Sequence, residues 1–280
     1  MTTAVRTMLT VPGATLHYEL RGAGPLLLIA QSGEGDADRT EALVGHLADR
    51  YTVVTYDRRG LSRSTRQDPT APVTPQTHAE DLHHLLAALT DRPALLLGCS
   101  LGALYGLHLA AAHPGQVHTL VAHEPATPGL LPTADRAGIR RTLDGIVRTH
   151  RAEGWAPAMR QIAAAVALDP SAMDAEPGFT MPPATAQRIA NFEFFLANDL
   201  PELRDSTLCP ADLAAPATRR VRIVPAAGRT SGQAWNHRCA EELAALLGTD
   251  IVEFPGGHNG NTTHPRAFAA RLHELLDASL

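Results

Sequence analysis

Short runs of apolar residues, separated by longer amphipathic stretches, are the dominant pattern of this sequence. Residues 26–30, 52–56 and 94–98 are almost continuously apolar, which is typical of strands buried on both faces of a sheet. Residues 40–47 and 79–89, which lie between these runs, carry their apolar positions on one helical face. Strands that alternate with helices in this way predict a parallel sheet covered by helices on both faces.

The same pattern predicts five further strands and two further helices. Two short strands flank a Pro12-Gly13 turn at the start of the chain, and the alternation resumes after residue 118. Together with the three runs above, the predicted sheet has eight strands. The added strands are expected at residues 4–9, 14–20, 119–122, 221–224 and 251–254, and the added helices at residues 233–247 and 265–276.

Residues 128–208 interrupt the alternation of strands and helices. Helical stretches recur at residues 134–153, 156–167 and 185–196, and nothing between them predicts a strand. A long helical segment between two strands of one sheet indicates a lid rather than a separate domain with its own sheet. We therefore predict a core of residues 1–127 and 209–280, with a helical lid insertion at residues 128–208.

Length and composition limit the kind of protein that this sequence can encode. With 280 residues, of which 44% are hydrophobic, the chain can bury a large core. The net charge of −5 and the pI near 6.3 argue against binding to nucleic acid. The apolar runs are too short to span a membrane and the N-terminus lacks a signal-peptide core, so we expect a cytoplasmic protein without membrane association.

The absence of lysine and the small number of cysteines exclude several reaction mechanisms and binding sites. All 24 basic residues are arginine, which excludes mechanisms that depend on a lysine amine. Cys99, Cys209 and Cys239 are too few and too scattered for a disulfide framework or a zinc site. We expect no metal, no other cofactor and a small molecule as the binding partner. The pattern leaves open whether the protein is a monomer or a homodimer.

The segment Gly98-Cys99-Ser100-Leu101-Gly102 follows an apolar strand and precedes a helix rich in Ala and Leu. In this context the G-x-S-x-G pattern is typical of a nucleophile elbow, where glycines two residues on either side of the serine permit a tight turn. A thiol is the better intrinsic nucleophile, but Cys99 has Leu97 and Leu101 at the two positions that need glycine. Ser100 is therefore the predicted nucleophile.

With this elbow the chain resembles the α/β-hydrolase superfamily, and the resemblance extends over essentially the whole length. Residues 56–64, YDRRGLSRS, are similar to the D-x-R-G-x-G-x-S segment of that family, with Ser62 in place of the second glycine. The resemblance implies a mostly parallel eight-stranded sheet with helices on both faces and a helical lid. It also implies that Asp57, Arg58 and Arg59 are structural residues.

The resemblance also implies the catalytic base. The family places its catalytic histidine just after the last strand, where this chain reads Phe254-Pro255-Gly256-Gly257-His258. A serine hydroxyl is a poor nucleophile until a base takes its proton, so His258 is the expected base. His123, beside a predicted strand, and His264, close to a helix start, are the competing histidines.

The acid departs from the commonest family pattern. The loop after the strand at residues 221–224, where that pattern places an aspartate, contains no carboxylate. Glu124 follows the preceding strand by two residues, in a position that some relatives use, including a subset of haloalkane dehalogenases. A carboxylate there can still orient the histidine and stabilise its charged form. The alternative interpretation is that Glu124 is a carboxylate at a helix N-terminus before the lid.

Backbone amides and aromatic side chains complete the predicted site. The amide of Leu101 and one amide from the loop after residues 26–30 are expected to form an oxyanion hole. Ser32 is the first choice for the second amide, with Gln31 and Gly33 as alternatives that also contact the substrate. The predicted lid holds Trp155, Phe192 and Phe195, which indicate an apolar pocket for an uncharged substrate.

Three hypotheses of function remain open at this point. The leading one is a serine hydrolase that cleaves an ester, thioester or related acyl bond of a mainly apolar small molecule through an acyl-Ser100 intermediate. The second is a non-hydrolytic enzyme on the same scaffold, such as a cyclase, lyase or acyltransferase of specialised metabolism. The third is a ligand-binding relative that keeps the three side chains for sensing. Fold alone does not decide among them.

Overall fold

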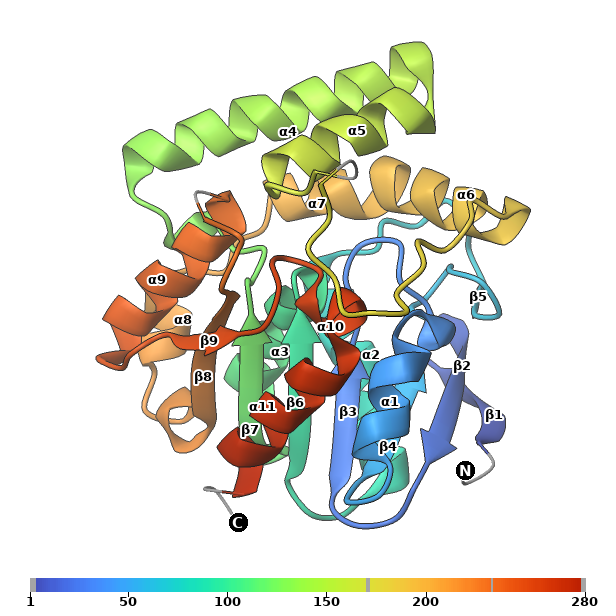
Figure 1. Cartoon of the computed structure of the whole chain (residues 1–280), viewed down its shortest axis with the longest axis vertical. Helices are drawn as coiled ribbons and strands as arrows, with labels where there is room; N and C mark the ends of the chain where they lie inside the picture. Colours follow the sequence, from blue (N-terminus) through green and yellow to red (C-terminus); the bar gives the residue numbers. More distant parts are fainter. Residues whose placement is uncertain (1–3, 170–171, 233, 278–280) are drawn as a thin grey trace.

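A computed structural model describes residues 4–169, 172–232 and 234–277 of the chain. The strands form one sheet in the order β1-β2-β4-β3-β6-β7-β8-β9 (Figure 1), and a further strand, β5, pairs with β2. The count of eight strands therefore missed β5, whose two residues are too few to show a periodicity. The strands are β1 (Val5–Val11), β2 (Ala14–Arg21), β3 (Leu26–Ala30), β4 (Thr52–Tyr56), β5 (Thr65–Arg66), β6 (Ala94–Cys99), β7 (Val117–His123), β8 (Arg222–Gly228) and β9 (Val252–Phe254).

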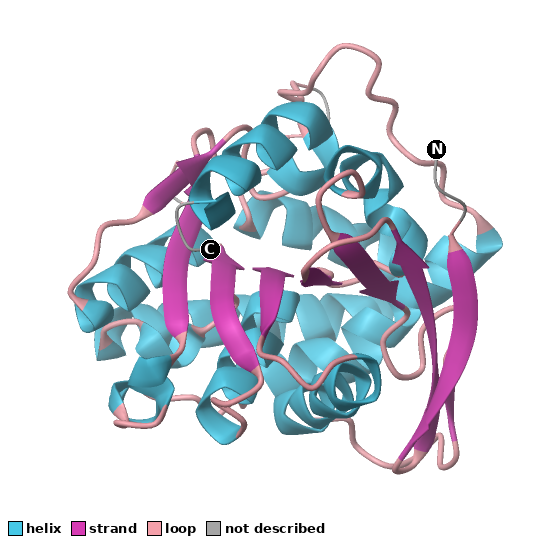
Figure 2. Cartoon of the chain, turned by 90° about the horizontal axis from the view of Figure 1, so that it is seen from below, coloured by secondary structure: helices cyan, strands magenta, loops and turns pink. Residues whose placement is uncertain are grey.

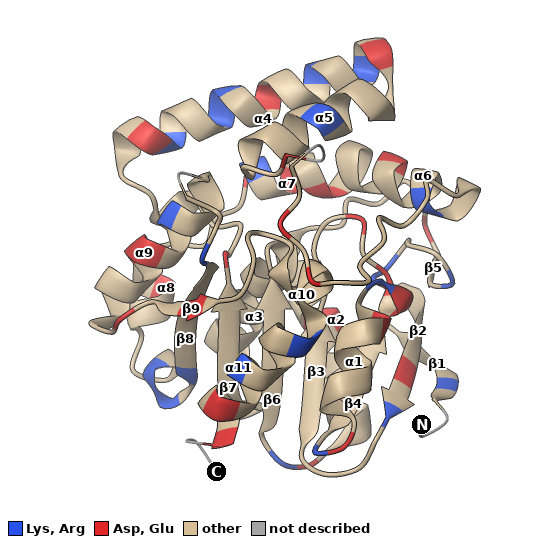
Figure 3. Ribbon diagram, in the orientation of Figure 1, with Lys and Arg blue, Asp and Glu red and all other residues tan. Residues whose placement is uncertain are grey.

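The central strands lie where the apolar runs predict them. β3 and β4 coincide with the predicted ranges, and neither they nor β6 and β7 carry a charged residue (Figure 3). The largest difference is β8, which continues past Val224 to Gly228 and is buried over that stretch. The sequence did not predict this extension because of Pro225. Proline cannot donate a hydrogen bond to a neighbouring strand and normally indicates the end of a central strand.

The sheet is mostly parallel, as predicted. Adjacent strands from β4 through β3, β6, β7 and β8 to β9 are paired in parallel, whereas β2 pairs antiparallel with β1, β4 and β5. The carboxyl ends of parallel strands meet at one edge of a sheet, which is where ligands bind in open α/β folds. The ends of β3, β6, β7 and β9 therefore bring the predicted site residues to one edge.

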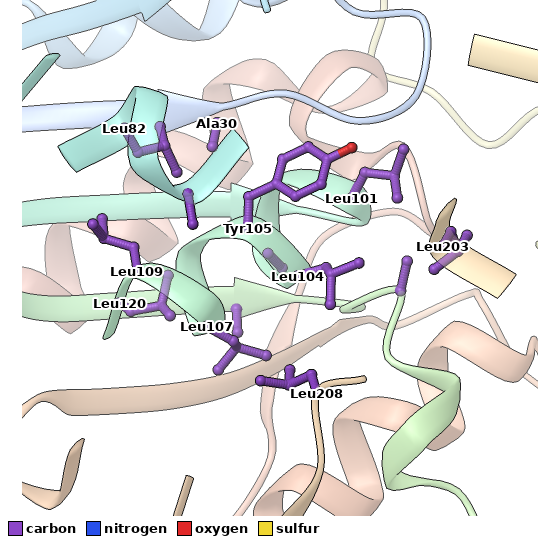
Figure 4. Close-up of a cluster of buried hydrophobic side chains, with 14 of the residues drawn as sticks. Ala30, Leu82, Leu101, Leu104, Tyr105, Leu107, Leu109, Leu120, Leu203 and Leu208 are labelled. Atoms are coloured by element: carbon purple, nitrogen blue, oxygen red, sulfur yellow. The ribbon is translucent and has the colours of Figure 1, made fainter. Parts of the chain in front are cut away.

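Helices cover both faces of the sheet (Figure 2). Leu28, Leu96 and Leu120 point to the face that is covered by α2 (Pro75–Leu89), α3 (Leu101–Ala112), α8 (Pro210–Ala214) and α9 (Trp235–Leu247). The alternate strand residues, such as Leu27 and Leu95, pack against α1 (Glu41–Leu47) and α11 (Pro265–Asp277). Figure 4 shows Tyr105 and Leu104 of α3 within the first of these cores.

No helix in the described part of the chain is long and apolar enough to cross a membrane.

The segment 128–208, here called the cap segment, contains helices and no strand among its described residues. It contains α4 (Thr133–Glu153), α5 (Trp155–Ala165), α6 (Ala186–Phe194), a π-helical turn (Phe195–Asp199) and α7 (Leu200–Arg204), and Figure 1 shows these helices over the carboxyl edge of the sheet. α4, α5 and α6 begin and end within two residues of the predicted ranges, whereas the π-helical turn and α7 were not predicted. Residues 170–171 of the predicted lid lie outside the described residues, as do 1–3, 278–280 and Gln233, the first residue of the predicted helix 233–247.

Arg58 joins the cap segment to the core through a buried ion pair. Its guanidinium donates to Asp199 Oδ2 over 2.8 Å, and both side chains are fully buried. The same guanidinium donates to the hydroxyl of Tyr105 (3.3 Å) and to the carbonyl of Gly33. Arg58 therefore fixes the loop after β3, the helix α3 and the cap segment relative to one another.

We expect Asp199→Ala to lower the free energy of unfolding by about 3–5 kcal/mol, because it leaves the charge of Arg58 buried and unpaired. Urea denaturation followed by circular dichroism measures the change. The matched control is Asp277→Ala, which removes a surface ion pair of 2.7 Å with Arg50 whose side chains are 51% and 54% exposed. That control should lower the free energy of unfolding by at most about 1 kcal/mol. If both variants lower the free energy of unfolding by the same small amount, the ion pair of Arg58 with Asp199 does not constrain the fold.

Candidate active site

The turn between β6 and α3 holds Ser100 in a strained conformation. The backbone of Ser100 has φ 55° and ψ −112°, a combination that residues other than glycine rarely adopt. A Cβ atom at Gly98 would lie 2.6 Å from Ala103 Cα, and one at Gly102 would lie 2.0 Å from the carbonyl oxygen of Ala30. Both glycines are therefore required by close backbone approach, as the G-x-S-x-G pattern predicts.

Glu124 and His258 form a direct hydrogen bond from different strand ends. His258 Nδ1 lies 2.7 Å from Glu124 Oε2, and the carboxylate is fully buried. The other carboxylate oxygen accepts hydrogen bonds from the amide of Gly228 (2.9 Å) and from the hydroxyl of Ser231. The carboxylate is thus bound to the loops after β8 and β9 and does not cap a helix, which removes the alternative interpretation of Glu124.

The charge state of Glu124 follows from these contacts. Burial alone would raise the pKa of Glu124, but the nearby His237 and the hydrogen bond and charge of His258 hold it well below its ordinary value. His237 Nδ1 lies 3.8 Å from Glu124 Oε1, and the carboxylate in turn raises the pKa of His237. Sequence reasoning did not single out His237 or Ser231, because neither stands in a recognisable motif. The loop after β8 brings Ser231 to Glu124, and α9 brings His237 there.

The competing histidines and carboxylates point elsewhere. His123 is buried against the rings of Phe254 and Phe268 with no hydrogen-bond partner on either nitrogen, and burial lowers its pKa to about 4. His264 Nδ1 lies 2.9 Å from the hydroxyl of Thr263. The carboxylate of Asp212 accepts from the amide of Cys209 at the start of α8, over 2.9 Å.

Ser100 and His258 line the same cavity, which has a volume of about 200 Å³. Among the described residues there is no hydrogen bond between the two side chains, and such contacts often tighten only when substrate binds. Most of the wall is apolar and comes from the cap segment. The residues are Ser32, Gly33, Glu34, Arg39, Ser100, Leu101, Ala126, Leu143, Met159, Ile162, Ala163, Ala165, Val166, Leu168, Met181, Arg188, Phe192, Phe195, Leu200, Leu203, Trp235, Asn236, His258 and Asn259.

Two predicted substrate contacts do not reach this cavity. Gln31 is fully buried and its amide donates to the hydroxyl of Thr40 over 2.5 Å, so its side chain holds the loop rather than a ligand. Trp155 lies behind the wall, where its ring stacks on Phe192 with centroids 5.3 Å apart. Phe192 and Phe195 do line the cavity, as their spacing on one helical face predicts.

The amides expected to form an oxyanion hole border the same cavity. Leu101 is the first residue of α3, so its amide has no carbonyl to pair with inside the helix. Ser32 and Gly33 lie on the loop after β3, and the carbonyl of Gly33 is fixed by Arg58. The choice of Ser32 as the second donor stays a prediction.

The charges in the cavity wall were not expected from the sequence. Glu34 Oε1 lies 3.1 Å from Arg188 Nη2 and 3.8 Å from Arg39 Nη2. Glu34 lies in a loop of small and polar residues, yet its side chain is only 13% exposed. The contact joins residues 154 positions apart, and no local pattern indicates such a pair.

A second cluster of polar side chains lies outside the cavity. Ligand atoms of Glu80, His83 and His113 lie within 4.8 Å of one another in the described part of the chain. The rings of His83 and His113 are stacked, with centroids 3.8 Å apart and an angle of 12° between their planes. Two stacked, parallel imidazoles cannot direct their nitrogen lone pairs at one ion, so in this arrangement the cluster does not form a metal site.

Comparison with known proteins establishes the family. A family model described as the alpha/beta hydrolase fold matches residues 25–198, which is more than half of the chain. The protein therefore belongs to the α/β-hydrolase fold family, and it is an enzyme of that family. The resemblance that was seen at the elbow is confirmed, as is the predicted fold class.

Two similar proteins are named hydrolases. The uncharacterized hydrolase YraK of Bacillus subtilis (strain 168) is 36% identical over 270 residues, which are 96% of this chain and 95% of that protein. A zearalenone hydrolase of Bionectria ochroleuca is 32% identical over 124 residues, or 43% of this chain and 47% of that protein. Both the sequence family and these relatives identify the protein as a hydrolase of the α/β fold.

Solved structures share the fold at low sequence identity. An esterase from Exiguobacterium antarcticum has a TM-score of 0.75 and 18% identity, with 99% of this chain and 100% of that chain covered. The enol-lactonase from Burkholderia xenovorans LB400 has a TM-score of 0.70 and 20% identity, with 97% and 100% covered.

Glu124 should make the stability of the protein depend on pH in a predictable direction. Its pKa is lower in the folded chain than in the unfolded chain, where it lies near 4.5. The carboxylate therefore stabilises the fold above that pH. This contribution falls by up to about 1.4 kcal/mol for each pH unit below it. Glu124→Gln has no proton to gain, so the stability difference between wild type and variant should narrow as the pH falls from about 5 to 3.

Urea denaturation at several pH values measures this difference. Asp277→Asn is the control, because Asp277 is half exposed at the surface and its ion pair with Arg50 contributes little. A stability difference between wild type and Glu124→Gln that does not change with pH would contradict a buried, ionised Glu124.

Proposed function

We propose that the protein is a serine hydrolase that cleaves an ester, thioester or related acyl bond of a mainly apolar small molecule through a covalent intermediate on Ser100. One observation carries this proposal. His258 is hydrogen-bonded to the buried Glu124 over 2.7 Å, and His258 and the strained Ser100 border the same cavity. A nucleophile, a base and a group that orients the base are the parts that acyl transfer to serine requires.

In the proposed reaction, His258 Nε2 takes the proton of the Ser100 hydroxyl as the oxygen attacks the acyl carbon. The negative charge that develops on the acyl oxygen is stabilised by the amide of Leu101 and an amide of the loop at Ser32. His258 then donates the proton to the leaving group, whose bond to the acyl carbon breaks. Water, deprotonated by the same histidine, attacks the acyl-serine and releases the acid product.

Glu124 has a positioning role in this scheme. Its carboxylate accepts the Nδ1 hydrogen of His258, which leaves Nε2 of the neutral ring free to accept the proton of Ser100. The same carboxylate stabilises the charged imidazolium that forms after proton transfer. Because the pKa of Glu124 is held low, the carboxylate remains ionised at neutral pH.

The structure weakens one argument for a non-hydrolytic enzyme. The absence of a carboxylate after β8 would favour an altered site, but the amide of Gly228, at the end of β8, binds the carboxylate of Glu124 instead. The acid is therefore supplied from β7 to the same place. The relatives that cover most of the chain, or nearly half of it, are also named hydrolases. These points favour hydrolysis over cyclase, lyase or acyltransferase chemistry.

The cavity wall supports an apolar substrate. Leu143, Met159, Ile162, Phe192 and Phe195 of the cap segment all face the space above Ser100. Burial of apolar substrate groups against such side chains contributes about 25 cal/mol for each Å² removed from water. The cap segment would then act as the lid that the sequence predicts, with the substrate between it and the carboxyl edge of the sheet.

Ser100→Ala should reduce kcat for 4-nitrophenyl butyrate by about 10⁶ while the fold is retained, since only one hydroxyl is removed. Cys99→Ala is the matched control, because it alters the neighbouring buried side chain. Burial raises the pKa of the Cys99 thiol to about 12, so the thiol is protonated and unreactive at neutral pH. Steady-state kinetics should show the control within about tenfold of wild type. Retention of activity by Ser100→Ala at that level would refute the acyl-enzyme mechanism.

A further inference from the structure

Three charged side chains interrupt the otherwise apolar wall of the cavity. Glu34 and Arg39 lie on the loop after β3 and in the short 3₁₀ turn that follows it, and Arg188 lies on α6 of the cap segment. Their side chains are 13%, 12% and 19% exposed. Among the described residues of the wall, two positive charges therefore face one negative charge.

Arg188 finds its partners within the protein. Its Nη2 donates to Glu34 Oε1 over 3.1 Å, and its Nη1 donates to the carbonyl of Pro182. The guanidinium also lies over the ring of Phe192, 5.1 Å from the centroid. Burial alone would raise the pKa of Glu34, but Arg39 and Arg188 lower it, so Glu34 is ionised and its charge balances one arginine.

Arg39 is the arginine that remains without a hydrogen-bonded anion. The nearest carboxylate oxygen, Glu34 Oε1, is 3.8 Å from Arg39 Nη2, beyond hydrogen-bond distance, and already accepts from Arg188. Arg39 Nε is buried and has no hydrogen-bond partner among the described residues. The guanidinium thus contributes an unbalanced positive charge to the cavity wall.

The acidic neighbours of Arg39 in the chain do not supply the missing partner. Asp36 Oδ2 accepts from the hydroxyl of Ser62 over 2.7 Å. Asp38 Oδ1 lies 3.3 Å from Arg63, on the outside of the loop. Both carboxylates are therefore engaged away from the cavity.

A largely buried guanidinium without a hydrogen-bonded anion is costly, and a ligand anion removes that cost. We propose that Arg39 binds a carboxylate carried by the substrate, beside the Glu34–Arg188 pair. The inference rests on the proposed function, since the same substrate presents its acyl carbon to Ser100. The substrate class is then an acyl compound with a carboxylate at the end of an apolar chain, in place of the uncharged molecule expected from the sequence.

The experiment compares charged and neutral esters of equal length. The charged series consists of mono-4-nitrophenyl esters of straight-chain dicarboxylic acids from glutaric to sebacic acid. The neutral series consists of 4-nitrophenyl esters of the matching monocarboxylic acids, in which a methyl group replaces the free carboxyl group. At one chain length the wild type should prefer the charged ester in kcat/KM on the order of 10- to 100-fold, the range for a hydrogen bond to a charged group.

Variants of Arg39 assign the preference to this residue. Arg39→Met, which keeps the length of the side chain without its charge, should abolish the preference, because it lowers kcat/KM for the charged ester more than for the neutral ester. Arg39→Lys, which keeps the charge, should retain part of the preference. Arg50→Met is the matched control, because Arg50 is half exposed and lies outside the cavity wall.

Each outcome decides the inference separately from the proposed function. If the wild type prefers the neutral ester at every length, or if Arg39→Met lowers both series equally, the carboxylate site is refuted while hydrolysis at Ser100 stands. If Arg39→Met does not fold, the preference of the wild type for the charged ester and the part of it that Arg39→Lys retains still decide whether Arg39 binds the carboxylate. If no ester in either series is hydrolysed, the proposed function fails, and calorimetric titration of Ser100→Ala with suberate tests the carboxylate site alone. Absence of binding in that titration would also refute the site.

Discussion

The arrangement of this site depends on one buried, ionised carboxylate. Moving a carboxylate out of water without partners costs more than most proteins can compensate, so it persists only where hydrogen-bond donors surround it. Glu124 has three such donors, from Gly228 at the end of β8, Ser231 in the loop after β8 and His258 in the loop after β9. Its need for these donors brings the loops after β8 and β9 to the end of β7. The position of the histidine beside Ser100 follows from the same requirement.

Close backbone packing supplies the second constraint. The elbow is possible only because Gly98 and Gly102 leave room for Ala103 and for the carbonyl of Ala30. This contact places the loop after β3 directly beside the start of α3, where the amide of Leu101 is free of an intrahelical partner. Arg58 then holds the loop through the carbonyl of Gly33 and connects it to the cap segment. The nucleophile, the candidate amides and the cap are therefore fixed by the same few contacts.

Features that depend on local sequence could be predicted, and features that depend on long-range packing could not. β3 and β4 coincide with their predicted ranges because a strand buried on both faces leaves a continuous apolar run. Ser100 could be identified because a tight turn requires glycines at fixed spacing. By contrast, the burial of Gln31 depends on Thr40, and the Glu34–Arg188 pair joins the core to the cap segment. Trp155 was placed in the wall from its residue type alone, but its ring packs behind Phe192.

The most direct test of this account is the rate at which a fluorophosphonate modifies the protein, followed by intact-mass and peptide mass spectrometry. A fluorophosphonate reacts with a serine only where a base activates the hydroxyl. We predict a single modification, at Ser100, that is slower in Glu124→Gln by a factor on the order of 10²–10⁴, since the variant no longer orients His258 through a carboxylate. Modification of Ser100 at equal rates in wild type and Glu124→Gln, or no modification of Ser100 at all, would contradict the central role of Glu124.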